Sequence, residues 1–95
     1  MGNFVGGPPG SGKYMNIDTA GGTLVKSGPG SLQAVVINSG TASATVSLFD
    51  GTTSAGVSMG VINAASEFDL SYGLQFNTGL FVETAGTPNI TVVYY

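Results

Sequence analysis

The sequence predicts an all-β domain, a small antiparallel β-sandwich or barrel-like fold. Short segments in which apolar and polar residues alternate recur along the chain, and glycine, asparagine or proline follows each of them. No window keeps the 3.6-residue apolar spacing of an amphipathic helix, and the longest helix-like run, residues 61–67, is too short to stand alone. A length of 95 residues corresponds to one domain.

Residues 1–12, MGNFVGGPPGSG, are expected to form a flexible or extended arm ahead of the domain, which spans residues 13–95. Five glycines and two prolines in this stretch disfavour a helix or a central strand. The arm contains two apolar anchors and two rigid prolines that are candidates for contacts with a neighbouring protein: Phe4, Val5, Pro8 and Pro9.

Eight strands are predicted within the domain, and the last reaches the final residue, so the C-terminal end is expected to be tied into a sheet. The predicted strands are residues 14–18, 23–26, 31–37, 44–50, 57–62, 67–72 with a continuation through 74 and 76, 80–84 and 90–95. Turn residues separate them at 20–22, 27–30, 38–40, 50–51, 77–79 and 85–89.

The alternation of residues assigns side chains to faces. It places Val46 and Leu48 on one face of their strand, opposite Thr45, Ser47 and Phe49. It places Val57, Met59 and Val61 on a common face, and it turns Phe68, Leu70, Tyr72, Phe76 and Tyr94 into the core. Three aromatic residues fall on the less buried side of their strands and are predicted to contact a partner: Phe49, Phe81 and Tyr95.

The charge content is low and makes several partners improbable. Only 7% of residues are charged, against roughly 25% in an average soluble domain, and 16 glycines, 10 serines and 10 threonines supply much of the polar surface. Such a surface is easily buried against another protein, because no ions must be desolvated. With no arginine, two isolated lysines and a net charge of −3, neither nucleic acid nor a membrane is an expected partner.

The side chains of catalysis are scarce, so no enzymatic activity, cofactor or metal site is expected. The chain has no histidine and no cysteine, which removes the commonest general base, metal ligand and thiol nucleophile. No serine or threonine has an activating base in a recognisable pattern. Residues 1–12 lack the features of a secretory signal, and the chain is expected to be made in the cytoplasm.

Residues 7–13, GPPGSGK, match the phosphate-loop pattern GxxxxGK by letters. That loop requires a preceding buried strand, a following helix and a hydroxyl residue after the lysine. Only six residues precede the motif here, Tyr14 follows Lys13, and residues 14–22 have no helical period. The match is therefore interpreted as a consequence of glycine and proline content.

Glu67 and Asp69 lie two residues apart on a predicted strand and would share a face. Such a pair, with Asp50, would be a candidate cation site, but alternation with Phe68 and Leu70 favours an ordinary solvated strand face.

Three segments carry a resemblance to a recurrent module of small phage virion proteins. They are LFDGT at 48–52, FNTGLFV at 76–82 and ITVVY at 90–94, in this order and spacing, and the resemblance covers about residues 23–95. Among such proteins, the chain resembles the capsid cement or decoration proteins. This resemblance implies a β-sandwich without catalytic residues that binds the major capsid protein on the outside of a phage shell. The analogy also implies a virion location and a homo-oligomer, by default a trimer. Two alternatives remain, a subunit associated with the tail, baseplate or fibre, and a non-viral carbohydrate-binding module.

Overall fold

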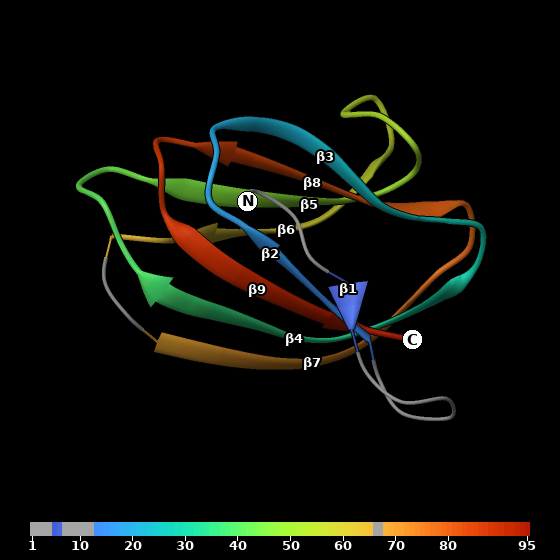
Figure 1. The fold of residues 1–95 in the computed structure, drawn as a ribbon. Helices are drawn as coiled ribbons and strands as arrows, with labels where there is room; N and C mark the ends of the chain where they lie inside the picture. Colours follow the sequence, from blue (N-terminus) through green and yellow to red (C-terminus); the bar gives the residue numbers. More distant parts are fainter. Residues whose placement is uncertain (1–4, 7–12, 66–67) are drawn as a thin grey trace.

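The computed structural model describes residues 5–6, 13–65 and 68–95, with side chains for 13–65 and 73–95. These residues form two antiparallel sheets that pack face to face (Figure 1). The strands are β1 (Val5–Gly6), β2 (Lys13–Ile17), β3 (Gly21–Ser27), β4 (Gly30–Ser39), β5 (Thr45–Asp50), β6 (Val57–Asn63), β7 (Phe68–Phe76), β8 (Gly79–Ala85) and β9 (Asn89–Tyr94). The predicted all-β sandwich is confirmed.

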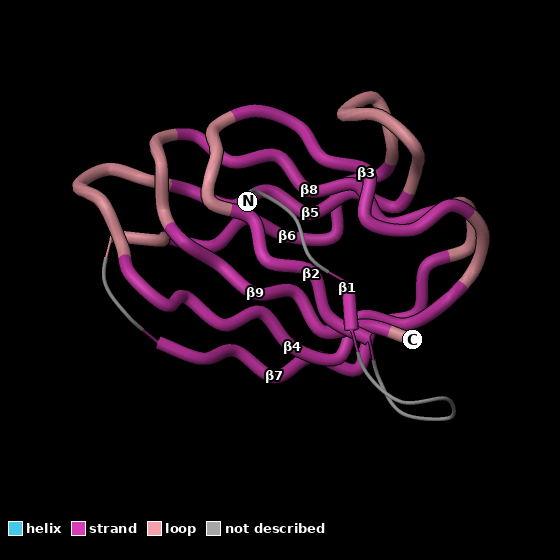
Figure 2. The backbone as a smooth tube through the Cα atoms, in the orientation of Figure 1, coloured by secondary structure: helices cyan, strands magenta, loops and turns pink. Residues whose placement is uncertain are grey.

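One sheet has the strand order β1-β2-β9-β4-β7 and the other the order β3-β8-β5-β6. Figure 2 shows that strands joined by loops account for the whole described chain, without a helix. It follows that the described part holds no helix long and apolar enough to cross a membrane. All eight predicted strands are present, with ends within two residues of the prediction.

The core consists of the inward-facing residues of the central strands of both sheets. On β5 these are Val46 and Leu48, and the side chains of Val82 on β8, Val92 on β9 and Val35 on β4 are equally inaccessible to solvent. Burying one such side chain stabilises the fold by roughly 1.5–3 kcal/mol. The predicted core positions Phe76 and Tyr94 are confirmed, whereas Phe68, Leu70 and Tyr72 lie outside the described side chains.

A β-bulge at Gln33 allows β4 to contribute to the core along its length. Leu32 and Val35 are both fully buried although they are three residues apart, an odd spacing that a regular strand would split between its two faces. The pairing with β7 steps from Leu32–Leu74 to Ala34–Ser71, which places an extra residue on β7. The pairing with β9 steps from Leu32–Tyr94 to Ala34–Val93, so there the extra residue is Gln33. Its side chain instead donates a hydrogen bond from Nε2 to Ser31 Oγ, 2.9 Å away.

A second bulge corrects the prediction that Val57, Met59 and Val61 share a face. The register of β5 with β6 shifts so that Ser58 pairs with Phe49 and Gly60 with Leu48, which leaves Met59 as the extra residue. Met59 packs against the core, while Val57 and Val61 are 74% and 66% exposed. The prediction was wrong because it assumed an unbroken alternation across Met59.

The N-terminal stretch contributes one short element to the described structure. Val5–Gly6 pair with Met15 and Tyr14 of β2 and form the edge of the five-stranded sheet. The other residues that were expected to form the arm, 1–4 and 7–12, lie outside the described residues. At the other end, Tyr95 exchanges two backbone hydrogen bonds with Ser31 of 2.9 and 3.1 Å, so the predicted attachment of the last residues to a sheet is confirmed.

Candidate functional site

The outer face of the four-stranded sheet carries a row of apolar side chains that points away from the core. Leu24 on β3 pairs with Phe81 on β8, and Phe81 pairs with Phe49 on β5. Directly opposed residues of antiparallel strands lie on the same side of the sheet. Leu24 is 42% exposed, and both phenylalanines are half-buried. We call these three residues the aromatic row.

The two rings of the row contact each other and a glycine. Their centroids are 6.4 Å apart and their planes are tilted by 54°, an arrangement typical of stabilising aromatic pairs. A β-carbon on Gly22 would lie only 2.3 Å from Cζ of Phe81, so the ring occupies the space that the glycine leaves open. Gly22 belongs to β3 and pairs with Glu83, contrary to the predicted turn at residues 20–22. The glycine and the neighbouring ring therefore restrict the orientation of Phe81.

The surroundings of the aromatic row are mostly uncharged. The next row on the same face consists of Gly22, Glu83, Ser47 and Val61, which are paired across the sheet in this order. Glu83 is its only ionisable residue, while Val61 extends the apolar surface towards the edge strand β6. Covering this face with another protein therefore requires the desolvation of one carboxylate at most.

Of the three predicted aromatic interface residues, the structure brings two together and separates the third. Phe49 and Phe81 are in contact, whereas Tyr95 lies beside Ser31 in the five-stranded sheet and is 51% exposed. Phe4, Pro8 and Pro9 lie outside the described residues, and of Val5 only the backbone is described. Sequence reasoning missed Leu24, because only the pairing of β3 with β8 places it beside Phe81.

Asp50 organises one end of the sandwich. Its carboxylate oxygens accept hydrogen bonds from the backbone N–H groups of Asn77, Thr78 and Gly79, at 2.9 to 3.4 Å. Gly51 N–H donates to Gly79 O at 3.0 Å, which closes the same junction. The β5–β6 and β7–β8 turns are thus held together, and we call this region the loop end.

The hydrogen bonds to Asp50 also decide what this carboxylate can bind. They favour its ionised form and lower the pKa of Asp50, although partial desolvation acts in the opposite direction. Because backbone donors occupy both oxygens, the arrangement is that of a structural cap. The described residues hold no group of three or more potential metal ligands, and the side chains of Glu67 and Asp69 are outside the description.

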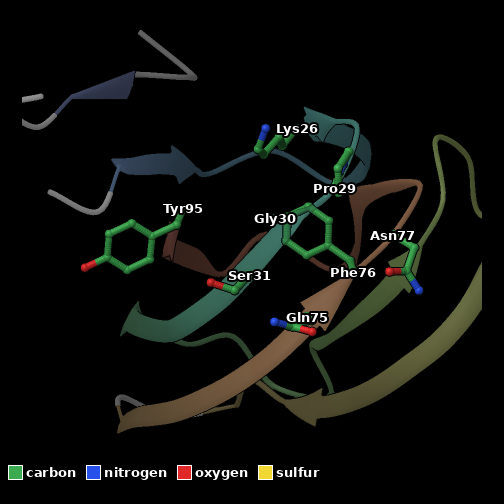
Figure 3. A pocket seen from close by; sticks show the side chains of 8 residues that line it. All are labelled: Lys26, Pro29, Gly30, Ser31, Gln75, Phe76, Asn77 and Tyr95. Atoms are coloured by element: carbon green, nitrogen blue, oxygen red, sulfur yellow. The ribbon is translucent and has the colours of Figure 1, made fainter. Parts of the chain in front are cut away.

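A pocket of about 480 Å³ opens beside the loop end (Figure 3). It is lined by Lys26, residues 29–31, residues 75–77 and Tyr95. Gly30 leaves room for three of its neighbours, because a β-carbon there would lie 2.3 Å from the carbonyl oxygen of Tyr95, 2.8 Å from Cζ of Phe76 and 3.0 Å from Cε of Lys26. The side chains of Lys26 and Phe76 and the backbone of Tyr95 therefore all lie close to Gly30.

The glycine-rich motif at residues 7–13 does not acquire the context of a phosphate loop. Residues 7–12 lie outside the described residues, and Lys13 begins the antiparallel strand β2, where a phosphate-binding loop would open a helix. This strand agrees with the interpretation of the motif as a consequence of glycine and proline content.

Comparison with known proteins gives no relative of this chain. No family model, no curated protein and no solved structure matches it.

Proposed function

We propose that this chain is a structural protein of a bacteriophage particle that binds the outside of the capsid and stabilises the shell, as cement and decoration proteins do. The observation that carries the proposal is the aromatic row, an exposed apolar surface on a hydrogen-bonded sheet. Aromatic side chains that are already held in place lose little conformational entropy on binding, and such residues dominate protein interfaces. The partner we propose is the major capsid protein.

The composition of the chain supports assembly. With 7% charged residues, its polar surface consists mainly of hydroxyl, amide and backbone groups. The outer face of the five-stranded sheet illustrates this: Asn38 Nδ2 donates to Asn89 Oδ1 at 3.0 Å and to Thr91 Oγ1 at 2.9 Å. Because neutral groups of this kind are cheaper to desolvate than ions, both faces are compatible with close packing in a particle.

The resemblance to phage virion proteins supports the location. Two of its three segments, 48–52 and 76–82, contact each other in the fold, because Asp50 accepts hydrogen bonds from Asn77 and Thr78. The segments thus form one structural unit, the loop end, and Phe49 and Phe81 of the aromatic row extend from it. Proteins that share a module in which the loop end is joined to the docking surface would also share the order and spacing of these segments.

Density-gradient fractionation of a lysate of the source system tests the location. We expect the chain to migrate with intact particles in stoichiometric amounts. Hundreds of copies per particle would identify a shell protein, whereas a few to tens would favour the tail, baseplate or fibre. If the chain stays with soluble protein at the top of the gradient, the virion proposal is wrong.

Substitutions test the docking surface in the same assay. Exchanging Phe49 and Phe81 for serine removes both rings, and we expect the variant to leave the particle fraction. The control is Val57→Ser, which removes an apolar side chain that is 74% exposed but lies outside the aromatic row. Circular dichroism establishes that both variants are folded. Attachment of the folded double variant at the wild-type level would exclude the aromatic row as the docking surface.

A further inference from the structure

We propose that Glu83 determines which partner the aromatic row accepts, by pairing with an arginine or lysine of the partner protein. The inference rests on the proposed function, because it concerns how the same surface selects its partner. Glu83 lies on β8, which runs between β3 and β5 (Figure 1). It is exposed and follows Phe81 by two residues, so both side chains lie on the outer face of the four-stranded sheet. We call this outer face the docking face.

The residues that surround Glu83 on the docking face carry no charge. Gly22 on β3 and Ser47 on β5 are its cross-strand neighbours. The rows on either side are also uncharged, and they consist of Leu24, Phe81, Phe49 and Ser58 on one side and Ala85, Thr45 and Asn63 on the other. A protein interface of standard size covers about 800 Å² of each partner, much more than three side chains. A partner seated on the aromatic row therefore also covers Glu83.

The chain itself supplies no cation to this carboxylate. It has two lysines and no arginine. Lys26 is paired with the fully buried Leu80, so it lies on the core side of the sheet, and Lys13 is paired with Tyr94 in the other sheet. A carboxylate that loses its water without gaining a partner strongly opposes binding. The counter-charge must therefore come from the protein that covers the docking face.

Glu83 also argues against a second copy of the chain as the occupant of this face. Two copies that pair face to face would enclose both Glu83 carboxylates in one interface, and neither docking face holds a lysine to neutralise them. Like charges enclosed in this way repel each other and stay unpaired. The occupant is therefore a different protein, as a capsid protein would be.

The Phe81 ring adds to the attraction for a cation. Gly22 is directly opposite Glu83, and the tip of the Phe81 ring occupies the space that a β-carbon on Gly22 would need. A side chain that approaches Glu83 thus also meets this ring. Arginine and lysine are suited to both contacts, because their charged groups are attracted to aromatic rings and their aliphatic stems pack on apolar surface.

Binding of the purified chain to particles assembled without it measures the contribution of Glu83. Glu83→Gln keeps the size of the side chain and removes its charge, so the partner's cation loses its counter-ion, and we expect at least ten-fold weaker binding. Glu83→Lys should bind more weakly still, because it brings two cations together. Asp69→Asn is the matched control, since it removes the same charge from β7 of the other sheet and should bind as the wild type does. Circular dichroism establishes that all variants are folded.

The possible results separate this inference from the proposed function. Equal or tighter binding by Glu83→Gln or by Glu83→Lys would overturn the pairing with a cation, while the aromatic row would remain the docking surface. Equal losses in Glu83→Gln and Asp69→Asn would also overturn it, because they would reflect net charge alone. If the wild type does not bind, or if the folded Phe49 and Phe81 double variant binds normally, the proposed docking surface is wrong and the role of Glu83 is wrong with it.

Discussion

Replacing Gly79 with alanine would push apart β8, β3 and the β5–β6 turn, which meet at the loop end. Gly79 begins β8, is buried, and pairs with Ser27 of β3. A β-carbon at this position would lie 2.8 Å from the carbonyl oxygens of both Gly51 and Lys26. These are backbone atoms of the β5–β6 turn and of β3, so neither can rotate away as the end of a side chain would. The strands must move instead.

The expected cost follows from the contacts that the movement disturbs. Forcing an extra carbon into a closely packed position costs roughly 1–3 kcal/mol. The displacement also strains the 3.0 Å hydrogen bond from Gly51 N–H to Gly79 O, whose loss costs about 1 kcal/mol. We therefore expect the free energy of unfolding to fall by about 2–4 kcal/mol, and the melting temperature by about 4–8 °C for each kcal/mol in a domain of this size.

Urea denaturation followed by far-ultraviolet circular dichroism measures this loss, and Gly73→Ala is the matched control. Gly73 is exposed on the edge strand β7, and a β-carbon there would have no neighbour within 4 Å. That variant should stay within about 0.5 kcal/mol of the wild type. If Gly79→Ala is equally neutral, the close approach of β8, β3 and the β5–β6 turn does not restrict the size of this residue, and the expected cost is wrong.

Three further results are expected. The folded state lowers the pKa of Asp50 below its ordinary value of 3.8. The stability that this group contributes is therefore complete above that value and is lost as the pH falls through the lowered pKa. Asp50→Asn should accordingly flatten the pH dependence of the melting temperature in the acid range. An unchanged acid profile of this variant would contradict the capping role. Leu48→Ala removes a fully buried side chain and should lower the free energy of unfolding by about 2–5 kcal/mol in urea titrations, whereas a loss below 1 kcal/mol would mean that the site collapses around the smaller residue. Deletion of residues 1–12 removes the β1 pairing but leaves eight strands, so the truncated chain should fold while attaching more weakly to particles. Unchanged attachment in the gradient assay would show that the arm is dispensable.

Much of the fold could be predicted because the alternation of apolar and polar residues within each strand indicates which side chains are buried. In β5 the alternation of Val46 and Leu48 with polar neighbours fixes which side chains enter the core, whatever strand lies beside it. The bulges limit this reasoning. The odd spacing of Leu32 and Val35 is a sequence signal for the bulge at Gln33 against β9, but nothing comparable marks Met59, where a strict alternation of apolar residues looks regular.

The candidate surfaces required strand pairing, which local sequence does not specify. Phe49 and Phe81 were predicted to be accessible from their positions in separate strands, but their contact depends on the adjacency of β5 and β8. Leu24 joins them because β3, from a distant part of the sequence, pairs with the other edge of β8. Similarly, the pocket combines the β3–β4 turn, the end of β7 and Tyr95, three segments whose individual sequences are ordinary turn and strand residues.

The positions of the two surfaces have a consequence for a chain attached to a particle. The aromatic row lies on the outer face of the β3-β8-β5-β6 sheet, whereas Tyr95, Ser31 and Gln75 are paired in the other sheet, on the side away from the core. A partner that covers the aromatic row therefore leaves this side of the pocket in contact with solvent. Attachment through the row would leave the pocket and Tyr95 exposed on the particle surface. Burial of Tyr95 on attachment would instead place the shell against the five-stranded sheet.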